Sequence, residues 1–280
     1  MKRTVVLCAA MTLALLSASG AAWAAVVTFA AAKNYPVGDR PQAVCAGDLD
    51  GDGDTDLVTA NQYSDNISVL IRRPDGTFRP QQKYAIGDGP RDVIVREDLD
   101  GDRDLDLAAA NYASDDVSVR LGSGEDTFGA QRRYATGPSG PMAIESGDLD
   151  GDGDKDLVTA NSGGGHGSKP DYSILGNVSV FKNRGDGTFR AARTYTAGET
   201  FEPNDVDRSD LDGDEDEDLV VSLNSTRAGD GGWQCYSTTV TAPSGSPIGT
   251  VAFAPTASSP TTSTVTETTT WRRRTFATAS

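Results

Sequence analysis

DLDGDGDTD, at residues 48–56, places five aspartates within nine residues. Their negative charges repel one another, so a folded loop that gathers them needs a compensating positive charge. Nearly the same phrase occurs three more times, as DLDGDRDLD (98–106), DLDGDGDKD (148–156) and DLDGDEDED (210–218). The first three phrases begin fifty residues apart, and the fourth begins sixty-two residues after the third. The chain is therefore a repeat protein, and the repeat decides its fold.

Segments with the composition of β-strands surround each acidic phrase. The runs that directly follow it are LVTAN (57–61), LAAAN (107–111), LVTAN (157–161) and LVVSLN (219–224). The alternating runs that come next are ISVLI (67–71), VSVRL (117–121) and VSVFK (178–182). A turn such as RPDGTF (73–78) or RGDGTF (184–189) then leads back to the start. Each repeat thus predicts four short strands, which in the first repeat lie at 43–46, 57–60, 67–71 and 78–84.

The predicted fold is all-β, a β-propeller-type repeat of four-stranded blades. One blade cannot bury both of its own faces, so blades must stack on one another. We expect about four blades in an incomplete ring, from units at 28–76, 77–126, 127–187 and 188–230. The insert at 162–176 in the third unit is rich in glycine and serine and predicts an exposed loop. It carries the single histidine, His166, and is interpreted either as a plain surface loop or as a binding loop.

The N-terminus has the pattern of a secretory signal peptide. Lys2 and Arg3 precede an apolar run, and small residues end it at Ala24. The apolar run is too short for a membrane anchor, the alternative interpretation. We expect cleavage after Ala24, secretion or surface localisation, and no transmembrane segment in the mature chain.

The C-terminal stretch, residues 231–280, differs in composition from the repeats. Threonine, serine and proline dominate it and the aspartate phrases are absent. One interpretation is a disordered or glycosylated low-complexity tail. The other is a frameshifted fifth blade, since back-translation of residues 264–275 in the neighbouring frame gives DGDGDDDLAAAN, close to residues 101–111.

Composition excludes some functions. The net charge of −16 excludes binding to nucleic acid through its phosphates, and it favours cation binding or self-repulsion. Of the three cysteines, Cys8 lies in the predicted signal peptide. Cys45 lies in an apolar run and Cys235 in the altered tail, so we predict no disulfide framework.

The spacing of the aspartates predicts a calcium site. Numbered from Asp48, positions 1, 3, 5 and 9 carry carboxylates, position 7 can offer its backbone carbonyl, and Gly53 at position 6 permits a tight turn. Hard oxygen ligands at this density suit Ca²⁺ better than Mg²⁺ or zinc. The alternative is that these phrases are simple acidic turns. Four copies with the same spacing of aspartates make that explanation a poor one. An EF-hand is excluded because position 12 is Thr59, Ala109, Thr159 or Val221 and strands flank the loop.

The phrase D-x-D-x-D-G-x-x-D between strands, followed by a G-D-G-T-F turn, resembles the FG-GAP/VCBS-type repeat family, which includes the calcium-binding blades of the integrin α-subunit propeller. The resemblance covers about residues 28–230. It implies a β-propeller, usually of seven blades, with Ca²⁺ in the hairpin loop between the first two strands of a blade.

Carried over by the resemblance, the metal ligands form four sets with one ion each. They are Asp48, Asp50, Asp52, Asp54 and Asp56; Asp98, Asp100, Asp102, Asp104 and Asp106; Asp148, Asp150, Asp152, Asp154 and Asp156; and Asp210, Asp212, Asp214, Asp216 and Asp218. Position 6 is Arg103 in the second loop and Glu215 in the fourth. A side chain there strains a left-handed turn by roughly 1–2 kcal/mol, so we expect these two sites to bind more weakly.

Two functions remain open at this stage. The first is a calcium-binding scaffold for adhesion or for binding an unknown protein or glycan. The alternative is the propeller portion of a secreted carbohydrate-active or other hydrolytic enzyme. No catalytic constellation is visible, because the repeat already accounts for the paired carboxylates as metal ligands.

Overall fold

The computed structural model describes residues 4–7, 30–163, 175–196, 201–209, 217–225, 236–241 and 250–254. This part of the chain consists of β-strands and loops, without a helix. Accordingly, it offers no helix of the length and hydropathy that a bilayer crossing requires.

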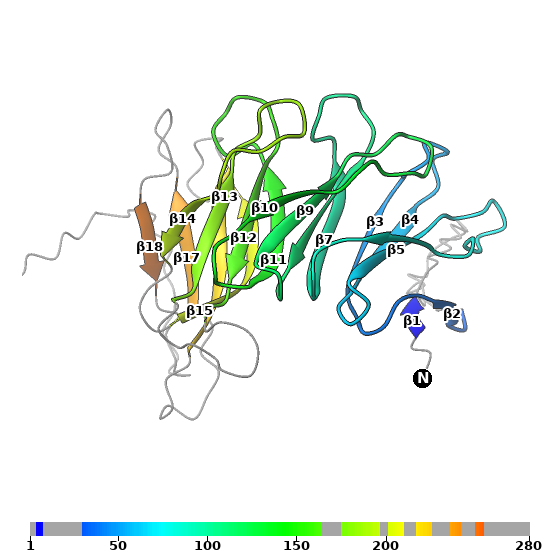
Figure 1. Cartoon of the computed structure of the whole chain (residues 1–280), viewed down its shortest axis with the longest axis horizontal. Coiled ribbons are helices and arrows are strands. Elements are labelled where there is room, and N and C mark those ends of the chain that lie inside the picture. Colours follow the sequence, from blue (N-terminus) through cyan, green and yellow to red (C-terminus); the bar gives the residue numbers. More distant parts are fainter. Residues whose placement is uncertain are drawn as a thin grey trace, which may run out of the picture.

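Four antiparallel sheets of four strands each, here called blades 1 to 4, make up the fold (Figure 1). Blade 1 contains β3 (Pro41–Gly47), β4 (Asp56–Asn61), β5 (Asn66–Leu70) and β6 (Gln82–Ala85). Blade 2 contains β7 (Pro90–Glu97), β8 (Asp106–Asn111), β9 (Asp116–Arg120) and β10 (Arg132–Ala135). Blade 3 contains β11 (Pro141–Gly147), β12 (Asp156–Asn161), β13 (Asn177–Phe181) and β14 (Arg193–Thr196). Blade 4 contains β15 (Phe201–Ser209), β16 (Asp218–Ser225), β17 (Tyr236–Thr241) and β18 (Thr250–Ala254).

The expected all-β architecture of four-stranded blades in an incomplete ring is confirmed. Each predicted strand of the first repeat lies within a residue or two of an observed one, except the fourth, which begins at Gln82 and not at Phe78. Phe78 instead forms an isolated bridge with Arg72 that closes the turn. Blade 4 draws β17 and β18 from the stretch interpreted as a tail, whose remaining residues lie outside the described part of the chain.

A fifth, two-stranded sheet lies at the N-terminal end. It pairs β1 (Thr4–Leu7) with β2 (Lys33–Pro36). β1 falls within the predicted signal peptide, most of which, including the expected cleavage point, lies outside the described residues.

The blades stand side by side and converge on their first strands. β3 contacts β7, β7 contacts β11, and β11 contacts β15, whereas no comparable contacts join the fourth strands β6, β10 and β14 of the described blades. The sheets therefore fan outward from a common inner edge, as blades do around a propeller axis. Figure 1 shows blade 1 and blade 4 at opposite ends of the array.

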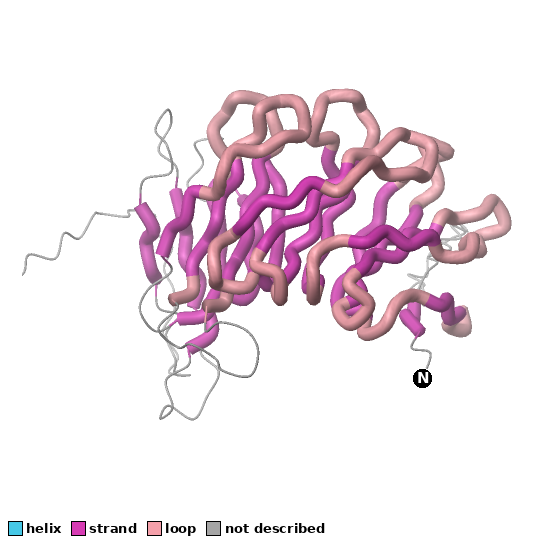
Figure 2. Tube along the Cα trace, viewed as in Figure 1, coloured by secondary structure: helices cyan, strands magenta, loops and turns pink. Residues whose placement is uncertain are grey.

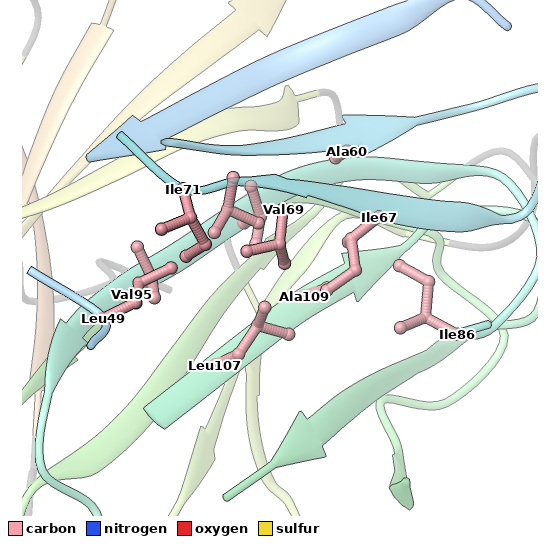
Figure 3. Packing of buried hydrophobic residues seen from close by; sticks show 11 residues of the cluster. Leu49, Ala60, Ile67, Val69, Ile71, Ile86, Val95, Leu107 and Ala109 are labelled. Atoms are coloured by element: carbon pink, nitrogen blue, oxygen red, sulfur yellow. The ribbon is translucent and has the colours of Figure 1, made fainter. Parts of the chain in front are cut away.

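Hydrophobic clusters fill each space between neighbouring blades. Between blades 1 and 2, side chains of Ile67, Val69 and Ile71 from blade 1 face Val95 and Leu107 from blade 2 (Figure 3). Two similar clusters lie between blades 2 and 3 and between blades 3 and 4. The second strand of each of blades 1 to 3 is buried along its whole length, because it lies at the centre of its sheet and is covered on both faces.

A buried asparagine ends each of these second strands and holds the chain that enters its blade. Asn61 donates to the Ser68 hydroxyl over 2.9 Å, and Ser68 also accepts the Gly38 backbone N–H, 3.3 Å away. In blades 1 and 3 the asparagine side-chain oxygen accepts a hydrogen bond from the threonine two residues earlier, over 3.1 and 2.9 Å. Blade 2 has Ala109 at that position, and the Asn111 oxygen is buried without a partner among the described residues.

We expect the substitution Ala109→Thr to stabilise the protein by about 1 kcal/mol, because it supplies the missing donor to a buried oxygen. Thr59 and Thr159 are fully buried at the equivalent positions, so the register accommodates a hydroxyl there. Ala108→Thr is the matched control, since it adds the same atoms to a buried strand position without reaching Asn111. Urea denaturation measures the change, and equal destabilisation by both substitutions would contradict the prediction.

Candidate metal centre

The acidic loops join the first strand of a blade to the second, at the same end of blades 1, 2 and 3. The second residue of each loop is a leucine whose side chain is buried between that blade and the next. These anchors are Leu49, Leu99 and Leu149, each no more than 5% exposed. Figure 3 shows Leu49 beside Ile71 and Val95. Each loop is thus fastened to the hydrophobic core directly beside its charged residues.

Each described loop brings three carboxylates together. One oxygen from each lies within 4.8 Å of the others. The sets are Asp48, Asp50 and Asp56; Asp98, Asp100 and Asp106; and Asp148, Asp150 and Asp152. The carboxylates at positions 1 and 3 belong to the cluster in all three loops. The third member is the carboxylate at position 9 in blades 1 and 2 and the carboxylate at position 5 in blade 3. Oxygen ligands at this separation are the kind that Ca²⁺ takes.

The aspartate at position 9 is the most buried carboxylate of each loop. In blade 2, Asp106 is 2% exposed and accepts the backbone N–H groups of Leu99 and Gly122, each over 2.7 Å. Asp56 accepts the equivalent N–H groups of Leu49 and Arg72, over 2.9 and 2.7 Å. These bonds close the loop and fix the carboxylate in place.

In blade 3 the same residue is left with a free oxygen. Asp156 is 1% exposed and accepts only one such bond, from the Asn183 backbone N–H over 2.8 Å. Its Oδ2 atom is buried without a hydrogen-bond partner in the described part of the chain. An unpaired buried carboxylate oxygen beside two further carboxylates is costly unless a cation or proton neutralises it. The equivalent oxygen of Asp56 and Asp106 accepts the leucine N–H of its loop. The three carboxylates that meet in this loop, Asp148, Asp150 and Asp152, are the donors that suit a hard cation.

The turn at position 6 requires a left-handed backbone. The φ angles are +84° at Gly53 and +93° at Gly153, where glycine accepts them without strain. Arg103 adopts +79° at the equivalent place in blade 2. Its N–H donates to Asp98 over 2.9 Å, so the loop keeps its shape despite the side chain. The strain expected at Arg103 is thus present in the folded backbone.

The carboxylates at position 7 point away from their loops toward the following turn. The Asp54 side chain pairs with Arg72, and the side chains of Asp104 and Asp154 lie against Gly124 and Gly185. This leaves the backbone carbonyl as the group that position 7 can offer to the loop centre.

Two features of the site were not expected from the sequence. Lys182 pairs with Asp150, a position 3 carboxylate, and so supplies positive charge to the third loop. Asn183 donates from its side chain to the Leu99 carbonyl of the neighbouring blade over 2.8 Å. The bond ties the loop of blade 2 to blade 3. The matching residue in blade 2 is Gly122, which has no side chain to form such a bond to blade 1.

The fourth loop lies largely outside the described residues. Asp210, Asp212, Asp214, Asp216 and Glu215 are not described. Asp218 is described and is 2% exposed, as buried as its counterparts in the other blades. His166 and Cys235 also lie outside the described part, and Cys45 is half-buried with a free thiol whose pKa burial raises.

Burial dominates the protonation of the position 9 carboxylates. It raises the pKa of Asp106 to about 6, with neighbouring Asp100 and Asp102 adding to the rise. It likewise raises the pKa of Asp156 to about 6, with Asp150 adding to the rise. The backbone N–H groups that bond these carboxylates oppose the shift but do not overcome it.

We expect the cation-free protein to lose stability as pH rises from about 4 to about 6. The folded state holds protons on Asp106 and Asp156 up to about pH 6, whereas the ordinary aspartate pKa is 3.8, so ionisation over this range favours unfolding. Added Ca²⁺ favours the ionised carboxylates and should remove or reverse this trend.

Melting temperatures across this pH range, with a chelator and with excess Ca²⁺, measure both trends. About 1 M KCl in all samples screens the long-range repulsion of the acidic chain, leaving the local effect. Identical pH profiles in chelator and Ca²⁺ would contradict the prediction.

Comparisons with known proteins agree with this architecture. An FG-GAP-like repeat model matches residues 98–159 and 168–221, and an FG-GAP repeat model matches residues 41–77. Together the matched stretches cover more than half of the chain. No curated protein matches significantly.

Solved structures also match, at low TM-scores. An Agrocybe aegerita lectin that recognises non-reducing terminal N-acetylglucosamine is 22% identical, with a TM-score of 0.43, covering 74% of this chain and 50% of the lectin. BBS1N, solved in complex with ARL6DN, is 12% identical, with a TM-score of 0.46 and coverages of 77% and 57%. The V. cholerae biofilm matrix protein Bap1 is 17% identical, with a TM-score of 0.38 and coverages of 72% and 37%.

The chain thus spans between about a third and three fifths of these proteins. The family models carry the assignment, since they match the acidic loops and strands that build the blades. The chain belongs to the FG-GAP repeat family.

Proposed function

We propose that the protein is a secreted or surface-located calcium-binding scaffold that binds a protein or glycan. The observation that supports the metal site most strongly is the repeated cluster of three carboxylates in the same loop of blades 1, 2 and 3. Members of this family generally serve as non-catalytic scaffolds, which agrees with a binding role.

Bound Ca²⁺ supplies the positive charge that the clustered carboxylates lack. The chain's own residues then do the positioning. Asp56 and Asp106 close their loops through backbone hydrogen bonds, and the leucine at position 2 fixes each loop to the space between two blades. Because that leucine and the carboxylates belong to one short loop, order in the loop supports the contact between neighbouring blades. Calcium binding is therefore coupled to the stability of the array.

Loops also join the strands at the other end of the blades (Figure 2), and the ligand is proposed to bind there. Tyr63 lies in the loop between β4 and β5 and is 64% exposed, with the Arg40 guanidinium stacked 4.7 Å from its ring centre. Blade 2 has a second arginine–tyrosine pair at neighbouring positions of the register, Arg91 and Tyr112, also at 4.7 Å. Tyrosine and arginine are enriched in binding surfaces, and the loop end of a rigid scaffold is where ligands commonly bind.

Isothermal titration of the chelator-treated full chain with Ca²⁺ tests the metal site. We expect binding of about four ions in a stronger and a weaker class, together with a rise in melting temperature. Mg²⁺ should compete poorly, because it prefers to keep its water ligands. A melting temperature that neither chelator nor Ca²⁺ changes would contradict the proposal.

Arg103→Gly should strengthen the second site. It relieves roughly 1–2 kcal/mol of backbone strain in the folded loop and removes a positive charge beside the bound cation. Arg103→Lys is the control, because it keeps both the strain and the charge and should titrate like the unchanged protein. Titration with Ca²⁺ and urea denaturation measure the two effects separately. A stronger site in both variants, or in neither, would contradict this interpretation.

A glycan array and a protein pull-down, each with Ca²⁺ and with chelator, test the ligand. Tyr63→Ala should reduce binding at the loop surface while leaving Ca²⁺ titration unchanged. The enzyme alternative predicts hydrolytic turnover that is lost on His166→Ala, and that result would replace the scaffold proposal.

A further inference from the structure

Blade 1 carries an interface residue that no other described blade covers. The first strand of each blade begins with or contains a proline, and the third residue after it occupies an equivalent place in all four blades. In each case this residue pairs across the sheet with the residue at position 12 counted from the start of the acidic phrase. Val93, Ile144 and Val206 occupy this place in blades 2, 3 and 4, pack against the preceding blade and are 3%, 1% and 3% exposed. Val44 occupies it in blade 1 and is 50% exposed. The face of blade 1 that carries Val44 therefore has an apolar residue where the other blades contact a neighbour, but no blade of the described array packs against it.

The strand β2 shows which kind of element belongs beside this face. In blades 1 and 2, a tyrosine of the fourth strand packs edge to face on a phenylalanine of the next blade. These pairs are Tyr84 with Phe128, whose ring centres are 5.5 Å apart, and Tyr134 with Phe189, 5.4 Å apart. Tyr35 of β2 packs in the same way on Phe78 of blade 1, at 5.1 Å. β2 thus stands where the fourth strand of a preceding blade would stand.

Blades 2 and 3 also share a specific polar contact. Asp92 accepts the Ile144 backbone N–H through Oδ2 over 3.0 Å, while its Oδ1 accepts the N–H of Val93 over 2.8 Å. Asp92 follows the bulge after Pro90 at the start of its blade. The carboxylate therefore joins the first strands of two consecutive blades.

Blade 4 presents the same carboxylate to solvent. Asp205 follows the bulge after Pro203, pairs across to Ser222 as Asp92 pairs to Ala110, and accepts the N–H of Val206 over 3.0 Å. It is exposed. Blade 4 thus carries the acceptor half of the contact, and Val44 of blade 1 occupies the position of the donor, Ile144. Blades 1 and 3 have Ala43 and Ala143 there, so the acceptor occurs only in blades 2 and 4 of the described array.

We propose that two copies of this chain associate head to tail, with blade 1 of each copy docked on blade 4 of the other. Val44 is then covered, and its backbone N–H donates to Asp205 of the second copy, as Ile144 donates to Asp92 within one chain. Because β18 is the fourth strand of blade 4, β18 of the second copy takes the place beside Phe78 that β2 holds in the single chain, and β2 moves outward. Two such contacts related by a two-fold axis close the assembly and leave neither end face open.

The test begins with the molar mass of the purified full chain, measured by light scattering during size-exclusion chromatography over a range of concentrations. We expect twice the mass of a single chain. Val44→Asp and Asp205→Lys should each weaken the association by about 100-fold. Val44→Asp places a charge in a desolvated contact opposite Asp205, and Asp205→Lys replaces the acceptor of the Val44 N–H with a cationic donor. Both residues are exposed in the single chain, so circular dichroism should show that the variants fold. Asp205→Asn keeps an acceptor oxygen and should remain largely dimeric.

Mixing the two charged variants distinguishes head-to-tail association from other arrangements. One contact of the mixed pair is unchanged, and the other brings the two introduced charges, which have opposite signs, together across the interface. The mixture should therefore recover the mass of two chains. Leu175→Asp is the matched control, since Leu175 is 39% exposed but lies outside both end faces, and it should leave the dimer intact.

Several results would overturn the proposal. A single-chain mass at every concentration would show that the Val44 face does not receive a second copy. Dimers that survive Val44→Asp, or that Leu175→Asp dissociates equally, would place the contact elsewhere. Failure of the mixture to recover the dimer would show that Val44 and Asp205 do not face each other across the contact. None of these results depends on whether the acidic loops bind calcium.

Discussion

Crowding of carboxylates in a nine-residue loop is the constraint on which the structure depends. Such a loop is stable only where hydrogen bonds and positive charge offset the repulsion, and the chain supplies the hydrogen bonds itself through the backbone N–H groups around Asp56 and Asp106. The same loop inserts a leucine between two blades. In blades 1 to 3 the carboxylate cluster and its apolar anchor are therefore adjacent, and ordering one helps to order the other.

Much of this architecture could be predicted from the sequence because its signals repeat. Four acidic phrases with alternating apolar runs between them indicate four-stranded units, and the strands in the structure follow that pattern. The carboxylates at positions 1 and 3 meet as their spacing suggests. Local periodicity carries such information well, since strand alternation and turn residues act within a few positions of one another.

Contacts between blades were harder to foresee, because they join residues far apart in the chain. Nothing in the sequence around Asn183 indicates that its side chain reaches the carbonyl of Leu99, and nothing around Asp92 indicates a bond to Ile144. The Asn111 oxygen, which has no partner among the described residues, likewise appears only when the three blades are compared at the same register. Each of these features depends on small differences between the repeats. A search for the pattern that the repeats share does not detect such differences.

The fan arrangement has a consequence for how such a chain changes over time. The extensive contacts of each blade are with its neighbours, and Arg208 of blade 4 reaches past blade 3 to pair with Glu97 of blade 2 over 3.1 Å. The link into a blade is held within that blade, as the bond from Gly38 to Ser68 illustrates. Gain or loss of one fifty-residue unit by recombination within the gene would therefore create a junction of a type already present and leave the remaining blades unchanged. The number of blades is accordingly a property that evolution can adjust in whole steps, while differences such as Asp92 and Asn183 record which neighbours each blade has come to depend on.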